Sequence, residues 1–281
     1  MTDKDTIKLI FFGDITGRQG RTAVKNYIAS LGEKPDFIIA NIENASHGFG
    51  LTKKNYEDLS QSGINCFTSG NHIWDKKDIF EYIDEADKLI RPINYPAGTR
   101  GQGSRIFEVK GQKIGVINAL GRVFMPPIDS PWTVVTDEIN KLKNDGVEHI
   151  IIDFHTEATA EKICFSKYLA HTFNTEEKAL IKAFIGTHTH VQTADEKIYY
   201  GMAYITDAGF CGTEESVIGM DFETSMRRLS TGLPERYEIA ETPVALINGV
   251  EILIDRTKST QIKRINLIVD NKAIERNNSE G

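Results

Sequence analysis

Short apolar runs alternate with amphipathic segments along most of the 281-residue chain. The runs have the length and composition of buried strands, and the segments between them repeat apolar residues at helical spacing. In residues 20–32, for example, Val24, Tyr27, Ile28 and Leu31 share one helical face. Alternation of this kind, with hairpins late in the chain, predicts an α/β fold of mixed sheets covered by helices.

The expected elements follow from these runs and from the turn residues between them. The strands are expected at 7–13, 36–41, 65–71, 113–120, 149–155, 180–188, 202–209 and 261–270. The helices are expected at 20–32, 52–63, 132–145 and 158–171. Residues 243–256 are expected to form a hairpin that turns at Asn248 and Gly249, a pair typical of type I′ turns. Residues 211–229 have weak periodicity and predict a loop beside the functional site.

No repeat or low-complexity linker divides the sequence. We therefore expect one domain over residues 1–270 and a disordered tail over residues 271–281. With 40% hydrophobic residues, a chain of this length can bury a sizeable core.

Composition excludes several classes of function. The net charge of −7 argues against stable binding to long nucleic acid, which depends on many Lys and Arg contacts to phosphates. A small phosphate ligand stays compatible if metal ions supply positive charge. The three cysteines form no CxxC motif, and no apolar stretch reaches membrane-spanning length. We expect a cytoplasmic protein without a membrane partner, and a homo-oligomer is compatible with the sequence.

Candidate metal ligands follow the predicted strands at the points where these end. They are Asp14, Glu43, Asn44, Asn71, His155, His188 and His190, with His72 directly after Asn71. In an α/β sheet the carboxyl ends of parallel strands share one edge, where ligands usually bind. The donors are oxygen and imidazole without sulfur, a set that suits manganese, iron or zinc.

Each of these residues has an ordinary explanation when taken alone. Asp14 could cap a helix, His155 could be a hydrogen-bonded core residue, and Asn71 could form a turn. Their joint occurrence at strand ends favours a functional edge instead. The glycines of "GDITGRQG" are not followed by the Lys-Ser/Thr of a phosphate loop, so Gly17 is expected to turn the chain from strand to helix.

The order Asp, Glu, Gly-Asn-His, His and His-x-His resembles the calcineurin-like metallophosphoesterases. The surrounding sequence resembles their YmdB-like branch over about residues 7–270, in "FFGDITGRQGR", "ANIENASHGFGLT", "TSGNHIWDKK", "DFHTEATAEK", "GTHTHVQTAD" and "TDAGFCGTEESVIGM". Two departures from the wider superfamily are typical of this branch: Asp14-Ile15-Thr16 lacks the usual histidine, and Glu43 replaces the bridging aspartate. In "GTEES" the expected proline after glycine is missing, which concerns substrate preference.

The resemblance implies a four-layer α/β/β/α fold with two mixed sheets flanked by helices. It also implies two divalent metal ions per chain, expected to be iron or manganese, with zinc or magnesium as alternatives. The first metal would be held by Asp14, Glu43 and His190 with Asn44 close by, and the second by Glu43, Asn71, His155 and His188.

The implied activity is hydrolysis of a small phosphodiester such as a 2′,3′-cyclic nucleotide. A hydroxide bridging the metals would attack phosphorus, and His72 would act as the catalytic residue outside the metal ligands. His47, in the loop after Glu43 and Asn44, is a further candidate for substrate binding.

Other functions remain open at this point. One is a metallophosphatase or phosphodiesterase of different specificity. Another is a metal-holding regulatory protein that interacts with RNA and has little turnover, although His72 favours an enzyme because a metal holder does not need it. An amidohydrolase is disfavoured because its His-x-His motif normally lies on the first strand.

Overall fold

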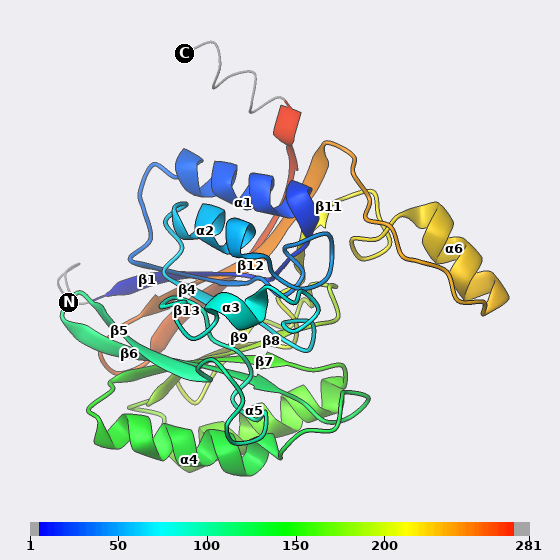
Figure 1. Ribbon diagram of the computed structural model, residues 1–281. Coiled ribbons are helices and arrows are strands. Elements are labelled where there is room, and N and C mark those ends of the chain that lie inside the picture. Colours follow the sequence, from blue (N-terminus) through cyan, green and yellow to red (C-terminus); the bar gives the residue numbers. More distant parts are fainter. Residues whose placement is uncertain (1–5, 273–281) are drawn as a thin grey trace.

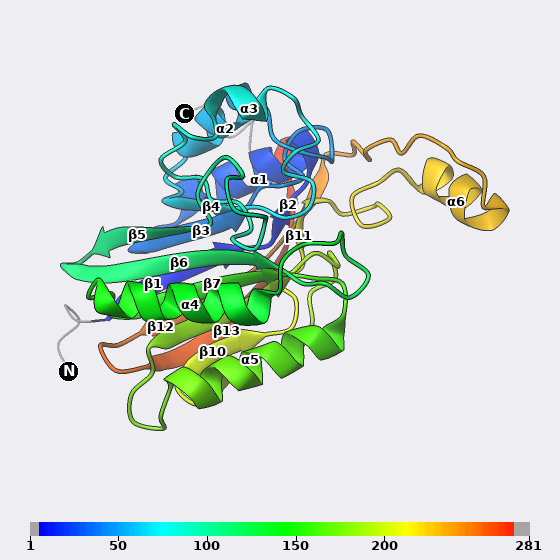
Figure 2. The same cartoon turned by 60° about the horizontal axis from the view of Figure 1, so that its bottom comes forward.

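Two mixed sheets lie face to face at the centre of the molecule, with helices on both outer sides (Figure 1). The structure is a computed structural model and describes residues 6–272. Figure 1 shows α4 and α5 on the outer side of one sheet and α1 and α2 beyond the other, and Figure 2 shows α3 beside α2. The predicted four-layer α/β/β/α architecture is confirmed.

Within the described residues, the first sheet has the strand order β2-β11-β12-β1-β3-β4, and β13 also pairs with β12. Its strands are β1 (Ile7–Phe12), β2 (Asp14–Ile15), β3 (Phe37–Asn41), β4 (Cys66–Thr68), β11 (Phe210–Thr213), β12 (Val244–Ile254) and β13 (Ser259–Asp270). Strands β1, β3 and β4 run parallel, whereas β12 runs antiparallel to β1, β11 and β13.

The second sheet has the order β5-β6-β7-β8-β10-β9 in the same part of the chain. Its strands are β5 (Ser104–Val109), β6 (Gln112–Leu120), β7 (His149–His155), β8 (Ile181–Thr187), β9 (Lys197–Tyr199) and β10 (Met202–Ile205). The four inner strands are parallel, and β5 and β9 are antiparallel edges. The helices are α1 (Gly17–Ser30), α2 (Lys53–Ser60), α3 (Ile79–Tyr82), α4 (Pro131–Asn144), α5 (Thr159–Phe173) and α6 (Phe222–Thr231).

Strand β1 shows why the apolar runs are continuous rather than alternating. Ile10 and Phe12 pack in the cluster under the helices, whereas Leu9 and Phe11 pack in the cluster between the two sheets. Successive side chains of a strand point to opposite faces, so a strand covered on both faces must be apolar at nearly every position. A third cluster fills the space between the second sheet and helices α4 and α5.

The predicted hairpin turn at Asn248 and Gly249 is wrong. Strand β12 passes straight through both residues and pairs on either side, with Gly249 opposite Phe12 of β1 and Ile265 of β13. A Cβ atom at position 249 would collide with the carbonyl oxygen of Phe11. The glycine therefore serves close approach of neighbouring strands, and tertiary pairing overrides its local turn preference. The hairpin turns later, where the amide of Asp255 donates to the carbonyl of Lys258.

Residues 211–229 differ from the predicted loop because α6 begins within them and continues to Thr231. The side chain of Asp221 accepts a hydrogen bond from the amide of Thr224 at the start of this helix, and Gly232 ends it in a left-handed conformation. Helix α6 stands out from the rest of the molecule in both views (Figures 1 and 2). We call residues 214–240 the arm.

The expected glycine turn is confirmed, since Gly17 has a φ of 63° where α1 begins. The division into one domain stays a prediction. Of the predicted tail, residues 273–281 lie outside the described part of the chain. Asn271 is buried, and its side-chain amide donates to the side-chain oxygen of Gln19 at 2.9 Å.

Candidate metal centre

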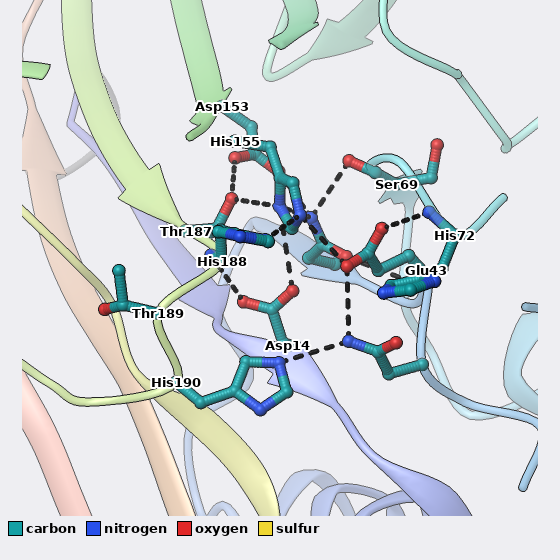
Figure 3. A network of polar contacts seen from close by, with 12 residues as sticks. Asp14, Glu43, Ser69, His72, Asp153, His155, Thr187, His188, Thr189 and His190 are labelled. Atoms are coloured by element: carbon teal, nitrogen blue, oxygen red, sulfur yellow. Dashed lines mark hydrogen bonds and ion pairs between the residues drawn. The ribbon is translucent and has the colours of Figure 1, made fainter. Parts of the chain in front are cut away.

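The predicted ligands follow the carboxyl ends of β1, β3, β4, β7 and β8. Figure 3 shows five of them facing one another: Asp14, Glu43, His155, His188 and His190. Glu43, His155 and His188 form the centre of this group, and one potential ligand atom from each lies within 4.8 Å of the others. Glu43 and His155 are buried, and His188 is half-buried.

The ring nitrogens of His155 and His188 are oriented by partners behind them. The hydroxyl of Thr187 donates to Asp153 at 2.7 Å, so it accepts from Nδ1 of His155 at 2.9 Å. On His188, Nε2 lies 3.2 Å from a carboxylate oxygen of Glu157, which can only accept. Each ring thus keeps a proton on the outer nitrogen and turns the other nitrogen inward.

These inward nitrogens give the strongest argument for a bound cation. Nε2 of His155 lies 3.0 Å from Nδ1 of His188 and 2.9 Å from Oε1 of Glu43. Two ring nitrogens and a carboxylate oxygen approach one another this closely only with a positive charge among them, which a proton or a metal ion can supply. All three groups are common ligands of zinc, iron and manganese. The residues therefore fit a divalent metal ion.

The electrostatics of the group lead to the same conclusion. Burial lowers the pKa of His155, but Glu43, Asp14 and Asp153 outweigh it and raise that pKa to about 9. Burial and the neighbouring His155 lower the pKa of His188 to about 3, so this ring is neutral. Burial raises the pKa of Glu43, yet the charge and hydrogen bond of His155 bring it well below its usual range. The group therefore binds a proton tightly at His155. A site with this affinity for positive charge also favours a metal cation, which displaces the proton.

A second set of ligand atoms lies beside the first. Nδ1 of His190 donates to the carbonyl oxygen of Ile218 at 2.8 Å, which leaves Nε2 as a lone-pair donor. The amide nitrogen of Asn44 lies between this Nε2, at 3.1 Å, and Oε1 of Glu43, at 3.2 Å. Asp14 accepts the backbone amide of His188 at 3.2 Å through Oδ2.

Three predicted ligands have a buried oxygen without a hydrogen-bond partner among residues 6–272: Oδ1 of Asp14, Asn44 and Asn71. An unpaired buried oxygen is costly, and metal coordination would satisfy it. Asn71 itself follows Gly70, where an added Cβ atom would collide with the side chains of Glu43 and His155. The polypeptide therefore runs directly against the group at this point.

The loop that holds His188 and His190 has a strained backbone, with φ values of 100° and 64° at these residues. A buried ion pair that sequence analysis did not find supports it. Lys162 lies 2.7 Å from Asp207 and donates to the carbonyl of Thr187 at 2.8 Å. Asp207 in turn accepts both the amide and the hydroxyl of Thr189. Neither residue gave a sequence signal, because a buried Lys on a helix looks like a surface one.

His72 lies beside the group without pointing a ring nitrogen at Glu43. Its backbone amide donates to Oε2 of Glu43 at 2.9 Å, while its Nδ1 pairs with Asp75 at 2.8 Å. The ring packs edge-on against Phe49, with centroids 4.9 Å apart. This placement agrees with a role toward substrate rather than metal.

A cavity of about 390 Å³ opens above the group. It is lined by residues of the arm and by five of the predicted site residues, Glu43, Asn44, His72, His188 and His190. Glu157 also lines it and was missed by sequence analysis, although it follows His155 by only two residues. His47 is exposed and is not among the lining residues, so the structure does not bring this candidate to the cavity.

No helix within residues 6–272 combines the length and apolar character needed to cross a membrane. The model of a family described as "YmdB-like protein" matches residues 10–265. A Bacillus subtilis protein named "2',3'-cyclic-nucleotide 2'-phosphodiesterase" is 44% identical over 92% of this chain and 96% of its own length.

Two solved structures are similar over nearly their whole length. One is described as a novel phosphatase of Mycoplasma pneumoniae, with a TM-score of 0.85, 36% identity and coverage of 96% of both chains. The other is a hypothetical protein of Thermus thermophilus, with a TM-score of 0.86, 32% identity and coverage of 93% of this chain and 99% of that one.

Proposed function

We propose that this chain, which belongs to the YmdB-like family of metallophosphoesterases, is a metal-dependent phosphodiesterase for 2′,3′-cyclic nucleotides. The observation that carries the proposal is the convergence of Nε2 of His155, Nδ1 of His188 and a carboxylate oxygen of Glu43. The similarity to the Bacillus subtilis phosphodiesterase supports the choice of substrate.

The proposed metal ligands fall into two overlapping sets. Asp14, Glu43 and His190, with Asn44 beside them, would hold one ion. Glu43, Asn71, His155 and His188 would hold the other. Bound divalent ions supply positive charge to the phosphoryl oxygens and lower the pKa of water, and iron and manganese suit the nitrogen and oxygen donors.

The protein's own contribution to the reaction is proton transfer and orientation. Water adds to phosphorus and the bond from phosphorus to the ribose 2′ oxygen breaks, which leaves a nucleoside 3′-phosphate. The departing oxygen needs a proton, and His72 is the proposed donor because it lines the cavity outside the proposed ligands. Its contact with Asp75 fixes the ring so that Nε2 is the nitrogen available to substrate.

The test is turnover by the purified, metal-replete protein. We expect 2′,3′-cyclic AMP to be converted to 3′-AMP, resolved from 2′-AMP by chromatography. A chelator should abolish activity, and adding back iron or manganese should restore it. Glu43→Gln should lose most metal and activity, because the shared ligand loses its charge.

Each outcome separates the alternatives. Turnover of monoesters or linear diesters but not of the cyclic diester would replace this specificity with another. Two bound metals without turnover of any ester would contradict an enzyme and favour the metal-holding regulatory function.

A further inference from the structure

The lining of the cavity combines two chemically different sets of residues. One set consists of proposed metal ligands and His72. The other is apolar and consists of Phe49, next to His72, with Val217, Met220, Leu229 and Tyr237 of the arm. We call the part of the lining that the arm provides the wall. The cavity volume of about 390 Å³ lies within the range of about 300–1,000 Å³ typical of small-molecule sites. A substrate whose phosphate meets the proposed metal ligands would therefore have its remaining part within reach of the apolar residues.

The arm is fixed to the metal centre by backbone contacts. The carbonyl of Ile218 accepts from His190, and Val217 pairs with Met220 in a short bridge. Met220 also pairs with Ile239 on the returning segment. The wall therefore has a fixed position relative to a proposed metal ligand.

An aromatic ring in this wall is also held in place. The guanidinium of Arg228 lies 4.6 Å from the ring centroid of Tyr237. The same side chain donates to the carbonyl of Glu235 at 2.8 Å, two residues before the ring. Arg227 pairs with Glu235 at 2.7 Å, so both arginines have partners within the arm. Fixed aromatic rings are the usual stacking surface for nucleobases.

Ser225 is a polar residue in this wall that no contact within the protein explains. It is 1% exposed and lines the cavity, yet its Oγ has no hydrogen-bond partner among the described residues. A buried hydroxyl left unpaired costs free energy, so its retention here points to a ligand with a polar edge. A hydroxyl both donates and accepts, so it can meet the edge of any base.

We propose that the arm forms a binding site for the base of the substrate, in which Tyr237 supplies a stacking surface and Ser225 a hydrogen bond. The proposal rests on the proposed function and assigns the specificity for nucleosides to residues 214–240. Heteroaromatic groups combine a flat apolar face with a polar edge, which is the combination that this wall offers.

The test compares two diesters with the metal-replete protein: 2′,3′-cyclic AMP and methyl β-ribofuranoside 2′,3′-cyclic phosphate, which lacks the base. Tyr237→Ala and Ser225→Val should each raise KM for the nucleotide about tenfold, the loss expected from one stacking or polar contact. The KM for the base-free diester and both kcat values should stay unchanged. Tyr237→Phe should match the unmodified protein, as should Ser230→Ala, an exposed serine of the same helix.

Equal changes on both diesters, or no change on either, would overturn the base site while leaving the phosphodiesterase intact. Equilibrium dialysis with adenosine tests the site without turnover. If the protein hydrolyses neither diester, the proposed function fails. Adenosine binding that Ser225→Val weakens would then support the base site alone, and no binding would reject it.

Discussion

In the candidate metal centre, a carboxylate oxygen of Glu157 lies 3.2 Å from Nε2 of His188, whereas Nδ1 of the same ring faces His155. The contact fixes both the tautomer and the rotation of His188. Carboxylates in this position raise the basicity of a histidine ligand and position it for the metal.

We expect Glu157→Ala to weaken metal binding about 10–100-fold, the usual effect of removing such a partner. Glu157→Gln should lose less metal affinity, because its amide oxygen can still accept a hydrogen bond from Nε2 of His188. Glu177→Ala, an exposed carboxylate before the amino end of β8, is the control. Competition with a metal-sensitive chelator measures the affinity. An unchanged affinity in Glu157→Ala would mean that the contact does not position the ligand.

Apolar periodicity predicts mixed sheets covered by helices, and the resemblance to a known family adds the four layers. The ligand set stays a prediction, drawn from polar residues at the ends of strands. Continuous apolar runs such as β1 require burial on both faces, and polar residues at their ends, such as Asp14 and His188, meet at one edge. Long-range contacts have no such signal. Gly249 resembles a turn residue until Phe11 is known to lie against it, and Lys162 is recognised only beside Asp207. The path of the arm over the cavity is equally a property of the folded chain.

Replacement of His72 separates catalysis from metal binding. His72→Ala keeps the backbone amide that donates to Glu43, so both the fold and the metal content should be retained. Turnover of 2′,3′-cyclic AMP should fall at least about 100-fold, the lower range for loss of a general acid.

The leaving group of an activated aryl diester needs no proton when it departs. The turnover of this diester should therefore fall less in His72→Ala than the turnover of the cyclic nucleotide. Steady-state rates on both esters and metal analysis of the variant provide the measurement. Equal losses would indicate that His72 orients the phosphoryl group, and loss of metal would make it a ligand.

Stability should fall in acid because of His149, a buried residue away from the metal centre. Its Nε2 donates to Gln112 at 2.7 Å, and burial, with Lys182 and Arg256 nearby, lowers its pKa to about 4. The unfolded chain binds this proton at about pH 6.5 and the folded chain only near pH 4. The stabilisation that comes from neutral His149 is therefore complete above about pH 6.5 and declines as the pH falls towards 4.

By pH 4, the titration of His149 should lower the free energy of unfolding by about 3 kcal/mol. Urea denaturation of the metal-free protein and of its His149→Gln variant across this pH range measures the effect. The quantity compared is the slope of the unfolding free energy against pH, not the absolute stability. Parallel pH profiles for the two proteins would show that His149 is not the group responsible.

Ile218 holds the arm to the metal centre in a conformation that disfavours its own side chain. Its φ is 48°, in the left-handed region, which costs L-residues roughly 1–2 kcal/mol and β-branched residues most. The carbonyl that His190 requires explains why the backbone adopts it. Ile218→Gly should therefore be more stable than Ile218→Ala by about 1 kcal/mol, the reverse of the usual order.

The control is Ile163, which lies in helix α5. At this position the glycine variant should be less stable than the alanine variant by about 1 kcal/mol. Thermal unfolding of the four variants decides the matter: if glycine is the less stable residue at both positions, the backbone at Ile218 is not strained.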